Sequence, residues 1–308
     1  MYQAINMAEV SIKSNYTLCM LACGTMGSAV LSGVLDSLSS VSSNSTVPIP
    51  GRFLACVKRQ ASADRIKSTY GDKVEVFVHN HLNAVAESDI VVLSCKPQLC
   101  EEILTSKGMK EALKGKLLIS VLAGTTIKQI QDFVGPETFV IRAMPNTPCK
   151  IRQGMTVISF PTSPSPSNST VDLVQVVPSP SVHQTVEWIF SQIGRAIFLE
   201  EKHLDTCTAL SGSGPAFACV MLEAMTDGGV MMGLPFAVAQ ELAAQTMQGA
   251  ARMVLDGNHP AQIRNSVSTP GGCTIGGLLV MEDGKIRSTI ARAIQEAANI
   301  AASLGKKR

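Results

Sequence analysis

The chain has 308 residues, of which 45% are hydrophobic and 16% are charged, and its formal net charge is +2. This length is enough for two domains with substantial cores. The nearly balanced charge, and the lack of a basic block interleaved with aromatic residues, argue against nucleic acid as a partner.

No uninterrupted apolar stretch reaches the length of a membrane span, so we expect no membrane association. Residues 1–17 lack the basic region and apolar core of a secretory signal. Nine cysteines are scattered through mostly apolar segments without the spacing of a metal site, so we expect no metal. Buried thiols are typical of a reducing compartment. We expect a cytoplasmic protein, with a non-secretory organelle as the alternative.

A short apolar run at 17–22 predicts a buried parallel strand, and residues 28–35 have helical spacing. Between them the sequence follows the form A-x-G-x-x-G, in which Ala22 takes the place of the usual first glycine. In a dinucleotide-binding turn, Gly24 would let the backbone approach the pyrophosphate and Gly27 would let the helix pack on the strand. Ala22 is unfavourable only if its position needs a positive φ. A strand-turn-helix unit without a ligand is the alternative interpretation.

The second predicted strand, residues 53–57, ends at two basic residues, Lys58 and Arg59. A site that prefers NAD would place Asp or Glu at this strand end to bind the ribose 2′-hydroxyl. A guanidinium group can instead pair with a 2′-phosphate and stack on adenine. We therefore expect NADPH as the cofactor, with NADH as the alternative. The other explanation of these two residues is that they are solvated surface charges.

Further apolar runs predict strands at 74–78, 90–94, 117–122, 139–142, 155–160 and 196–199. Helical segments alternate with most of them, which predicts an α/β, Rossmann-type, doubly wound parallel sheet. Since ligands gather at the carboxyl ends of parallel strands, Asn80 and Lys96 are expected at the cofactor edge. Two segments rich in Ser and Pro, 37–50 and 161–181, predict surface insertions, and we expect the second to be mobile.

From His203 onward the pattern is helical, with long segments at 216–225, 236–255 and 286–304. These segments are apolar on most faces, so each must be buried on most faces. Because so much apolar helix cannot bury itself, an intertwined dimer is predicted. The sequence therefore predicts a dinucleotide-binding domain at 16–200 and an all-α C-terminal dimerisation domain at 201–308.

The segment 267–277 reads Val-Ser-Thr-Pro-Gly-Gly-Cys-Thr-Ile-Gly-Gly and predicts a break between two helices. Pro270 would end the first helix, and Thr274 would open the second. Backbone N–H groups at a helix start can hold a carboxylate, and the Thr274 hydroxyl can bond a substrate nitrogen. The alternative is a Pro-Gly turn between packed helices.

Taken together, these motifs resemble the pyrroline-5-carboxylate reductase family. The resemblance runs from Thr17 to Gly305 and rests on the segments CGTMG at 23–27, KP at 96–97, MPNTP at 144–148, ALSGSGPA at 209–216, DGG at 227–229 with GLP at 233–235, and HP at 259–260 leading to STPGGCT at 268–274. It implies NAD(P)H-dependent reduction of Δ1-pyrroline-5-carboxylate to L-proline, the last step of proline synthesis. It also implies a helical dimerisation domain, active sites where one subunit's helices meet the other's nucleotide, and dimers that assemble further into rings of five.

Carried over to this chain, the resemblance assigns substrate binding to Thr269, Gly272, Cys273 and Thr274, and a catalytic hydrogen bond with the ring nitrogen to Thr274. Cofactor binding is assigned to residues that follow five strands: Cys23, Gly24, Thr25, Met26, Arg59, Asn80, Ser94, Cys95, Lys96, Pro97, Val121, Leu122 and Ala123. A protonated imine is already electrophilic, so the reaction needs positioning more than a strong general acid.

Two other functions are open. A β-hydroxyacid dehydrogenase or a 6-phosphogluconate-type reductase would use a lysine on a helix of the second domain as its acid or base. Only Lys202 and Lys285 precede the C-terminal pair there, and neither lies mid-helix in a Gly-rich pattern. A dinucleotide-sensing protein without activity would be expected to lose the polar, glycine-rich turn at 269–274, which is intact. Measured turnover separates these alternatives.

Overall fold

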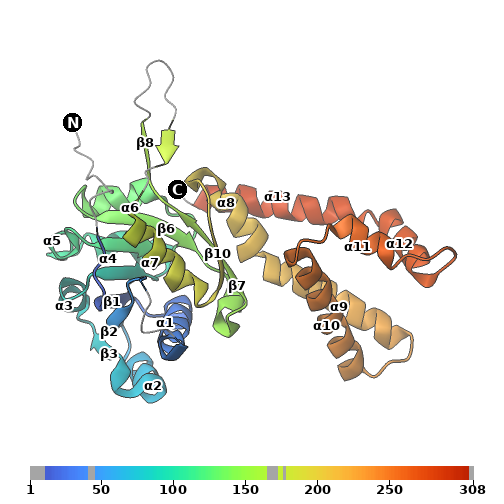
Figure 1. Ribbon diagram of the computed structural model, residues 1–308, viewed down its shortest axis with the longest axis horizontal. Coiled ribbons are helices and arrows are strands. Elements are labelled where there is room, and N and C mark those ends of the chain that lie inside the picture. The colour runs from blue at the N-terminus through green and yellow to red at the C-terminus, as the bar shows by residue number, and fades with distance from the viewer. Residues whose placement is uncertain (1–10, 41–45, 165–172, 176–177, 305–308) are drawn as a thin grey trace. The chain divides into compact units, whose positions relative to one another are not determined.

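The computed structural model describes residues 11–40, 46–164, 173–175 and 178–304. The chain forms two compact units, one made of Met1–Gly212 with Ala298–Arg308 and the other of Ser213–Ala297 (Figure 1). The division at Gly212 lies later than the boundary at 200 that the sequence predicts, and the last helix contributes to both units.

The first unit alternates strands with helices, as the apolar runs predict. Its strands are β1 (Tyr16–Leu21), β2 (Pro50–Val57), β3 (Glu75–Val78), β4 (Ile90–Leu93), β5 (Leu117–Ser120), β6 (Phe139–Met144), β7 (Gly154–Ser159), β8 (Thr162–Pro164), β9 (Leu173–Gln175) and β10 (Gly194–Phe198). Its helices are α1 (Thr25–Ser37), α2 (Gln60–Tyr70), α3 (His81–Ala86), α4 (Cys100–Leu104), α5 (Met109–Leu113), α6 (Ile127–Val134), α7 (Pro180–Ser191) and α8 (Leu204–Cys207). The short helices α4 and α5 are not predicted, because neither contains a full amphipathic period.

Eight of the described strands form one sheet in the order β10-β7-β6-β5-β4-β1-β2-β3. Strands β1 to β6 run parallel to one another, which confirms the doubly wound, Rossmann-type class. At one edge the prediction of a parallel sheet needs correction, since β7 pairs antiparallel with β6 and β10 runs parallel to β7. The reason is the connection: a short 3₁₀ turn, Thr147–Ile151, joins β6 to β7, whereas parallel neighbours need a crossover of about a dozen residues or more.

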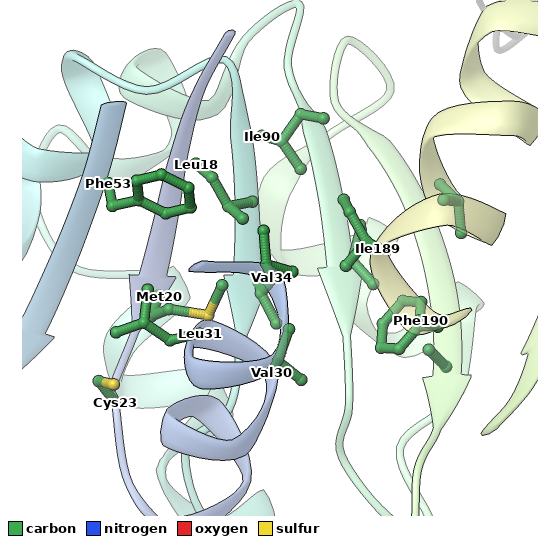
Figure 2. Close-up of a cluster of buried hydrophobic side chains, with 14 of the residues drawn as sticks. Leu18, Met20, Cys23, Val30, Leu31, Val34, Phe53, Ile90, Ile189 and Phe190 are labelled. Atoms are coloured by element: carbon green, nitrogen blue, oxygen red, sulfur yellow. The ribbon is translucent and has the colours of Figure 1, made fainter. Parts of the chain in front are cut away.

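Strand β1 lies inside the sheet and is buried on both faces, which explains its continuous apolar run. On one face, Leu18 and Met20 belong to a cluster that includes Val30 and Leu31 of α1 and Phe190 of α7 (Figure 2). The alternate residues of β1 belong to a second cluster on the opposite face, which includes side chains of α3, α4, α5 and α6. The sheet is therefore a central layer with helices on both sides, and the core holds the end of β1 in place.

Both Ser/Pro-rich segments contain more regular structure than the sequence predicts. Ser37 is the last residue of α1, residues 38–40 form a 3₁₀ turn, and Pro50 already begins β2. In the second segment, β8 and β9 pair in an antiparallel manner, and Pro180 begins α7. Mobility is predicted for residues 161–181, and of this segment residues 165–172 and 176–177 lie outside the described part of the chain.

The second unit is built from α9 (Gly214–Met231), α10 (Phe236–Leu255), α11 (Pro260–Ser266), α12 (Cys273–Asp283) and most of α13 (Ile286–Leu304). Helices α9 and α10 pack closely through small residues: a Cβ added to Gly229 would lie 3.0 Å from the Cβ of Ala239. Large apolar side chains are nevertheless exposed, among them Met231 and Met232 at 80% and Val280 at 72%. This unit does not bury its own apolar surface. None of the described helices is both long and apolar enough to span a bilayer.

Candidate functional site

The sequence-predicted cofactor residues all follow strands of the parallel part of the sheet. Strands β5, β4, β1, β2 and β3 are neighbours in that order and run in one direction, so their carboxyl ends share one edge. The structure therefore brings together Cys23 to Met26 after β1, Arg59 after β2, Asn80 after β3, Ser94 to Pro97 after β4, and Val121 to Ala123 after β5. Between β1 and β4 the strand order reverses, which is where open α/β sheets bind dinucleotides.

The turn that leaves β1 resolves the question of Ala22. This residue has a φ of 64°, a left-handed conformation that a residue with a Cβ adopts at a cost of about 1–2 kcal/mol. Its carbonyl oxygen accepts the Gly24 N–H at 2.7 Å and the Ser94 hydroxyl at 3.0 Å. The position does need a positive φ, so alanine is a less favourable residue here than the usual glycine.

The two glycines of the turn have different surroundings. A Cβ added to Gly27 would lie 2.5 Å from the Ser94 Oγ, so glycine is needed for the first turn of α1 to approach the end of β4. Gly24 is exposed, and a Cβ added to it would have the Ala22 oxygen as its nearest atom, 3.9 Å away. The backbone of Gly24 therefore faces open space. This is the arrangement that a diphosphate needs in order to approach closely.

Helix α1 begins at Thr25 without a side-chain cap and without an acidic residue in its first turn. The first N–H groups of a helix have no intrahelical acceptors, and the helix start carries partial positive charge. These donors suit a phosphate group. Together with the open face of Gly24, they fit the diphosphate of a dinucleotide.

Two cysteines at this edge stay neutral. Burial raises the pKa of the Cys23 thiol to about 11, although a hydrogen bond with Ser28 and the charge of Arg65 lower it in part. Burial also raises the pKa of Cys95 to about 12, and Cys100 adds to the shift. Both thiols keep their protons at neutral pH, so they add no negative charge where a diphosphate would bind.

The ends of β2 and β3 carry exposed polar side chains. Arg59 is the N-cap of α2, and its carbonyl oxygen accepts the N–H groups of Ser62 and Ala63, so its backbone is fixed. Neither Lys58 nor Arg59 forms an ion pair with any residue that the structure describes. Asn80 precedes α3 and makes no side-chain cap bond there, which leaves its amide group available to a ligand.

At the end of β5 the side chain of Leu122 is buried in the core, so only its backbone can face a cofactor.

The following loop is fixed by a residue that the sequence did not single out. Glu201 accepts the Ile127 N–H at 2.7 Å, at the start of α6, and lies 3.4 Å from the Arg142 guanidinium, which is 2% exposed. Asp205 lies 3.5 Å from the same guanidinium. No sequence signal links these residues, because they are far apart in the chain.

Two of the signature motifs contact each other. The Asn146 amide of the MPNTP segment donates to the Ser211 carbonyl of the SGSGP segment at 2.9 Å. Its oxygen accepts the Met155 N–H at 2.9 Å. Asn146 therefore joins the end of β6, the start of β7 and the segment before α9. These two motifs have a structural role in the described chain.

The segment 267–274 forms a tight turn before α12. Helix α11 already ends at Ser266, so Pro270 shapes the turn rather than ending the helix as predicted. Gly271 has a φ of 68°, and the Gly272 N–H donates to the Thr269 carbonyl at 3.0 Å. Helix α12 begins at Cys273, one residue before the predicted start.

This turn determines which donors are free. The Gly272 N–H is used within the turn, and a Cβ at Gly272 would lie 2.4 Å from the Thr269 Oγ1, so only glycine fits. Helix α12 has no side-chain cap and no acidic residue in its first turn. The N–H groups of Cys273 and Thr274 therefore have the properties of an anion site. Cys273 is exposed and Thr274 half-buried.

Comparison with known proteins identifies the family. Residues 201–304 match the family model described as pyrroline-5-carboxylate reductase dimerisation, and residues 17–124 match one described as NADP oxidoreductase, coenzyme F420-dependent. A pyrroline-5-carboxylate reductase of Schizosaccharomyces pombe is 51% identical over 94% of this chain and 99% of its own length. The chain belongs to the pyrroline-5-carboxylate reductase family. A reductase of the same name from Lophium arboricola is 45% identical over 95% of this chain and 94% of its own length.

Solved structures of pyrroline-5-carboxylate reductases have the same fold. One from Coxiella burnetii is 27% identical, with a TM-score of 0.78 over 96% of this chain and 100% of its own. One from Plasmodium falciparum, which has NADP bound, is 25% identical, with a TM-score of 0.74 over the same shares. The match to a dimerisation domain shows that the second unit is an oligomerisation domain, and this accounts for its exposed apolar side chains.

Proposed function

We propose that the protein catalyses the NAD(P)H-dependent reduction of Δ1-pyrroline-5-carboxylate to L-proline, the last step of proline synthesis. The observation that carries the proposal is the glycine turn at 269–274, which opens an uncapped helix start beside a threonine hydroxyl. Its sequence relatives of 45–51% identity are named for this activity.

The substrate is a five-membered cyclic imine with one carboxylate. We assign the carboxylate to the N–H groups of Cys273 and Thr274, with Gly272 and Thr269 shaping the turn that presents them. The Thr274 hydroxyl bonds the ring nitrogen and so fixes which face of the imine is presented. When bound, the reduced nicotinamide supplies a hydride to the imine carbon. Positioning two reactants in this way can lower a barrier by about 7–11 kcal/mol at best.

The carboxyl edge of the sheet is proposed to hold the cofactor. The uncapped start of α1 and the open backbone at Gly24 would hold the diphosphate, Asn80 the ribose, and the segments after β4 and β5 the nicotinamide half. The described part of the chain has no cluster of three or more His, Cys, Asp or Glu side chains with metal-binding geometry.

NADPH is the proposed preference over NADH. The support is the basic end of β2, where Lys58 and Arg59 have no ion-pair partner among the described residues. Arg59→Ala should raise the KM for NADPH about tenfold, the loss expected for a hydrogen bond to a charged group, and leave the KM for NADH within about twofold. Lys67→Ala, which removes an exposed charge later in α2, is the control. Equal effects of Arg59→Ala on both cofactors would contradict a 2′-phosphate contact.

The test of the reaction is oxidation of NADPH and of NADH with Δ1-pyrroline-5-carboxylate, followed by absorbance, and with an open-chain keto acid as the control. Oxidation that depends on the pyrroline and not on the open-chain acid is expected. Oxidation with the open-chain acid alone would favour a β-hydroxyacid dehydrogenase. Cofactor binding without turnover of any of these substrates would favour a dinucleotide sensor.

A homodimer, with dimers assembled further into rings of five, is the proposed quaternary structure. It is supported by the exposed apolar side chains of the oligomerisation domain. Light scattering after size-exclusion chromatography distinguishes a dimer from a ten-chain particle, and a monomer at micromolar concentration would contradict both.

We also propose a cytoplasmic location, which is supported by nine cysteines that are all free. Fractionation of cells that express a tagged chain tests it.

A further inference from the structure

The turn between β1 and α1 contains backbone strain at an unusual residue. Ala22 adopts a left-handed conformation, with a φ of 64°, although its Cβ disfavours it. The other non-glycine residues with positive φ in the described chain have polar or charged side chains: Asn15, His79, Arg152 and Lys285. Alanine has no polar group with which to stabilise this conformation locally. The stabilisation must therefore come from neighbouring residues.

Three hydrogen bonds surround the strained residue. The Ser94 hydroxyl donates to the Ala22 carbonyl at 3.0 Å, with the Leu21 carbonyl as a longer alternative acceptor at 3.3 Å, and the Gly24 N–H donates to the Ala22 oxygen at 2.7 Å. The Cys23 N–H donates to the Cys56 carbonyl at 2.7 Å. Only the first of these bonds comes from a side chain, and only that one can be removed without altering the backbone.

Ser94 itself is well fixed. Its N–H donates to the Leu21 carbonyl at 2.9 Å, because β1 and β4 are adjacent parallel strands and Leu21 pairs with Leu93. Its hydroxyl occupies the space that a Cβ on Gly27 would fill, since that Cβ would lie 2.5 Å away. The hydroxyl is therefore placed between the strained peptide and the first turn of α1.

We propose that Ser94 is a positioning residue, which holds Ala22 in its left-handed conformation and so keeps the backbone of residues 22–24 shaped for the diphosphate of the dinucleotide. The inference rests on the proposed function only in that a dinucleotide binds at this turn. It assigns the Ser94 hydroxyl an effect through Ala22 rather than through direct contact with the cofactor.

The proposal predicts a coupling between residues 22 and 94. Without the hydroxyl, Ala22 relaxes toward negative φ and the turn is shaped for binding only part of the time. The apparent Kd then rises by the inverse of that fraction. Glycine at position 22 has no Cβ and favours negative φ no more than positive φ, so it needs no such support. Loss of Ser94 should therefore matter much less when residue 22 is glycine.

The experiment measures binding of NADPH to the full chain by fluorescence titration in the variants Ser94→Ala, Ala22→Gly and the double variant. Ser94→Ala should raise the Kd about tenfold, equal to about 1.4 kcal/mol. Ala22→Gly should stay within about twofold of the wild type, and the double variant within about twofold of Ala22→Gly.

The control is Ser88→Ala. Ser88 is buried, and its hydroxyl donates to the Val85 carbonyl at 2.8 Å near the opposite end of β4. This variant should lower thermal stability without changing the Kd for NADPH, which separates positioning from a purely structural role. If Ser94→Ala does not fold, Ser94→Cys, which keeps a weak donor, takes its place in the same cycle.

Two results would overturn the inference while leaving the reductase function intact. An equal loss of affinity on removing the hydroxyl from the wild type and from Ala22→Gly would show that Ser94 contacts the cofactor directly. An unchanged Kd in Ser94→Ala would show that the turn keeps its shape without the hydroxyl. A wild-type chain that binds no dinucleotide would overturn the proposed function together with the inference.

Discussion

Gly27→Ala is predicted to impair cofactor binding by displacing the Ser94 hydroxyl. The added Cβ would lie 2.5 Å from the Ser94 Oγ, 3.4 Å from the Ser94 Cβ and 3.7 Å from the Cys23 Sγ. The hydroxyl can rotate away, but it then gives up its bond to the Ala22 carbonyl, a loss of about 0.5–1.5 kcal/mol. Residual overpacking adds about 1–3 kcal/mol. Replacing a helical glycine with alanine stabilises the helix by at most about 1 kcal/mol, so the net loss of stability is expected to be about 0.5–4.5 kcal/mol.

The assay compares Gly27→Ala with a matched variant in the same helix. At Gly33 an added Cβ would lie 2.4 Å from the Ile193 Cγ2 and 2.9 Å from the Gln192 carbonyl, far along α1 from the turn. Both variants should lower the free energy of unfolding in urea, but only Gly27→Ala should raise the Kd for NADPH, by about tenfold. If Gly27→Ala bound NADPH as tightly as the wild type, the contact with Ser94 would have no bearing on the cofactor turn.

Three further outcomes are expected. Thr274→Val should lower kcat/KM by about tenfold to a thousandfold, as loss of one aimed hydrogen bond can, with the Kd for NADPH unchanged; wild-type turnover would remove Thr274 from the mechanism. Glu201→Gln should lower the free energy of unfolding by about 1–3 kcal/mol, because it removes the charge that faces the buried Arg142, and an unchanged urea midpoint would contradict this. Stability should fall as the pH rises from about 9 to about 11, since the unfolded Cys23 thiol releases its proton first and the folded thiol keeps it. In Cys23→Ala, the free energy of unfolding should fall by about 1–3 kcal/mol less over this pH interval than in the wild type. An equal fall in both proteins would show that Cys23 does not contribute.

The elements that local pattern determines could be predicted from the sequence. The apolar run after residue 16 becomes β1 because a strand inside a parallel sheet is buried on both faces. The helical segments at 236–255 and 286–304 have the predicted bounds, because their periodicity is long and uninterrupted. Since the parallel strands were identified, the predicted cofactor residues could be placed at one edge without knowledge of the sheet order.

The features that depend on distant partners could not be predicted. Strand β7 is reversed because the turn before it is too short for a crossover, and periodicity does not report strand direction. The sequence raised the question of φ at Ala22, but only the structure shows that Ser94 holds its carbonyl oxygen. The contact of Glu201 with the start of α6 joins residues that are 74 positions apart, and no local motif marks it.

The chemistry explains why backbone groups, rather than perturbed side chains, mark this site. A protonated cyclic imine accepts a hydride without a strong acid, so the protein needs to orient two reactants and bind two anionic groups. Helix starts can provide anion sites where a ligand can approach the backbone and no side chain caps the helix, as at the starts of α1 and α12. Burial shifts two thiols at the cofactor edge, those of Cys23 and Cys95, toward the neutral form. In the proposed cofactor site, the Ser94 hydroxyl would act by position alone, because the orientation of peptide groups that face a diphosphate is set by hydrogen bonds from the residues behind them.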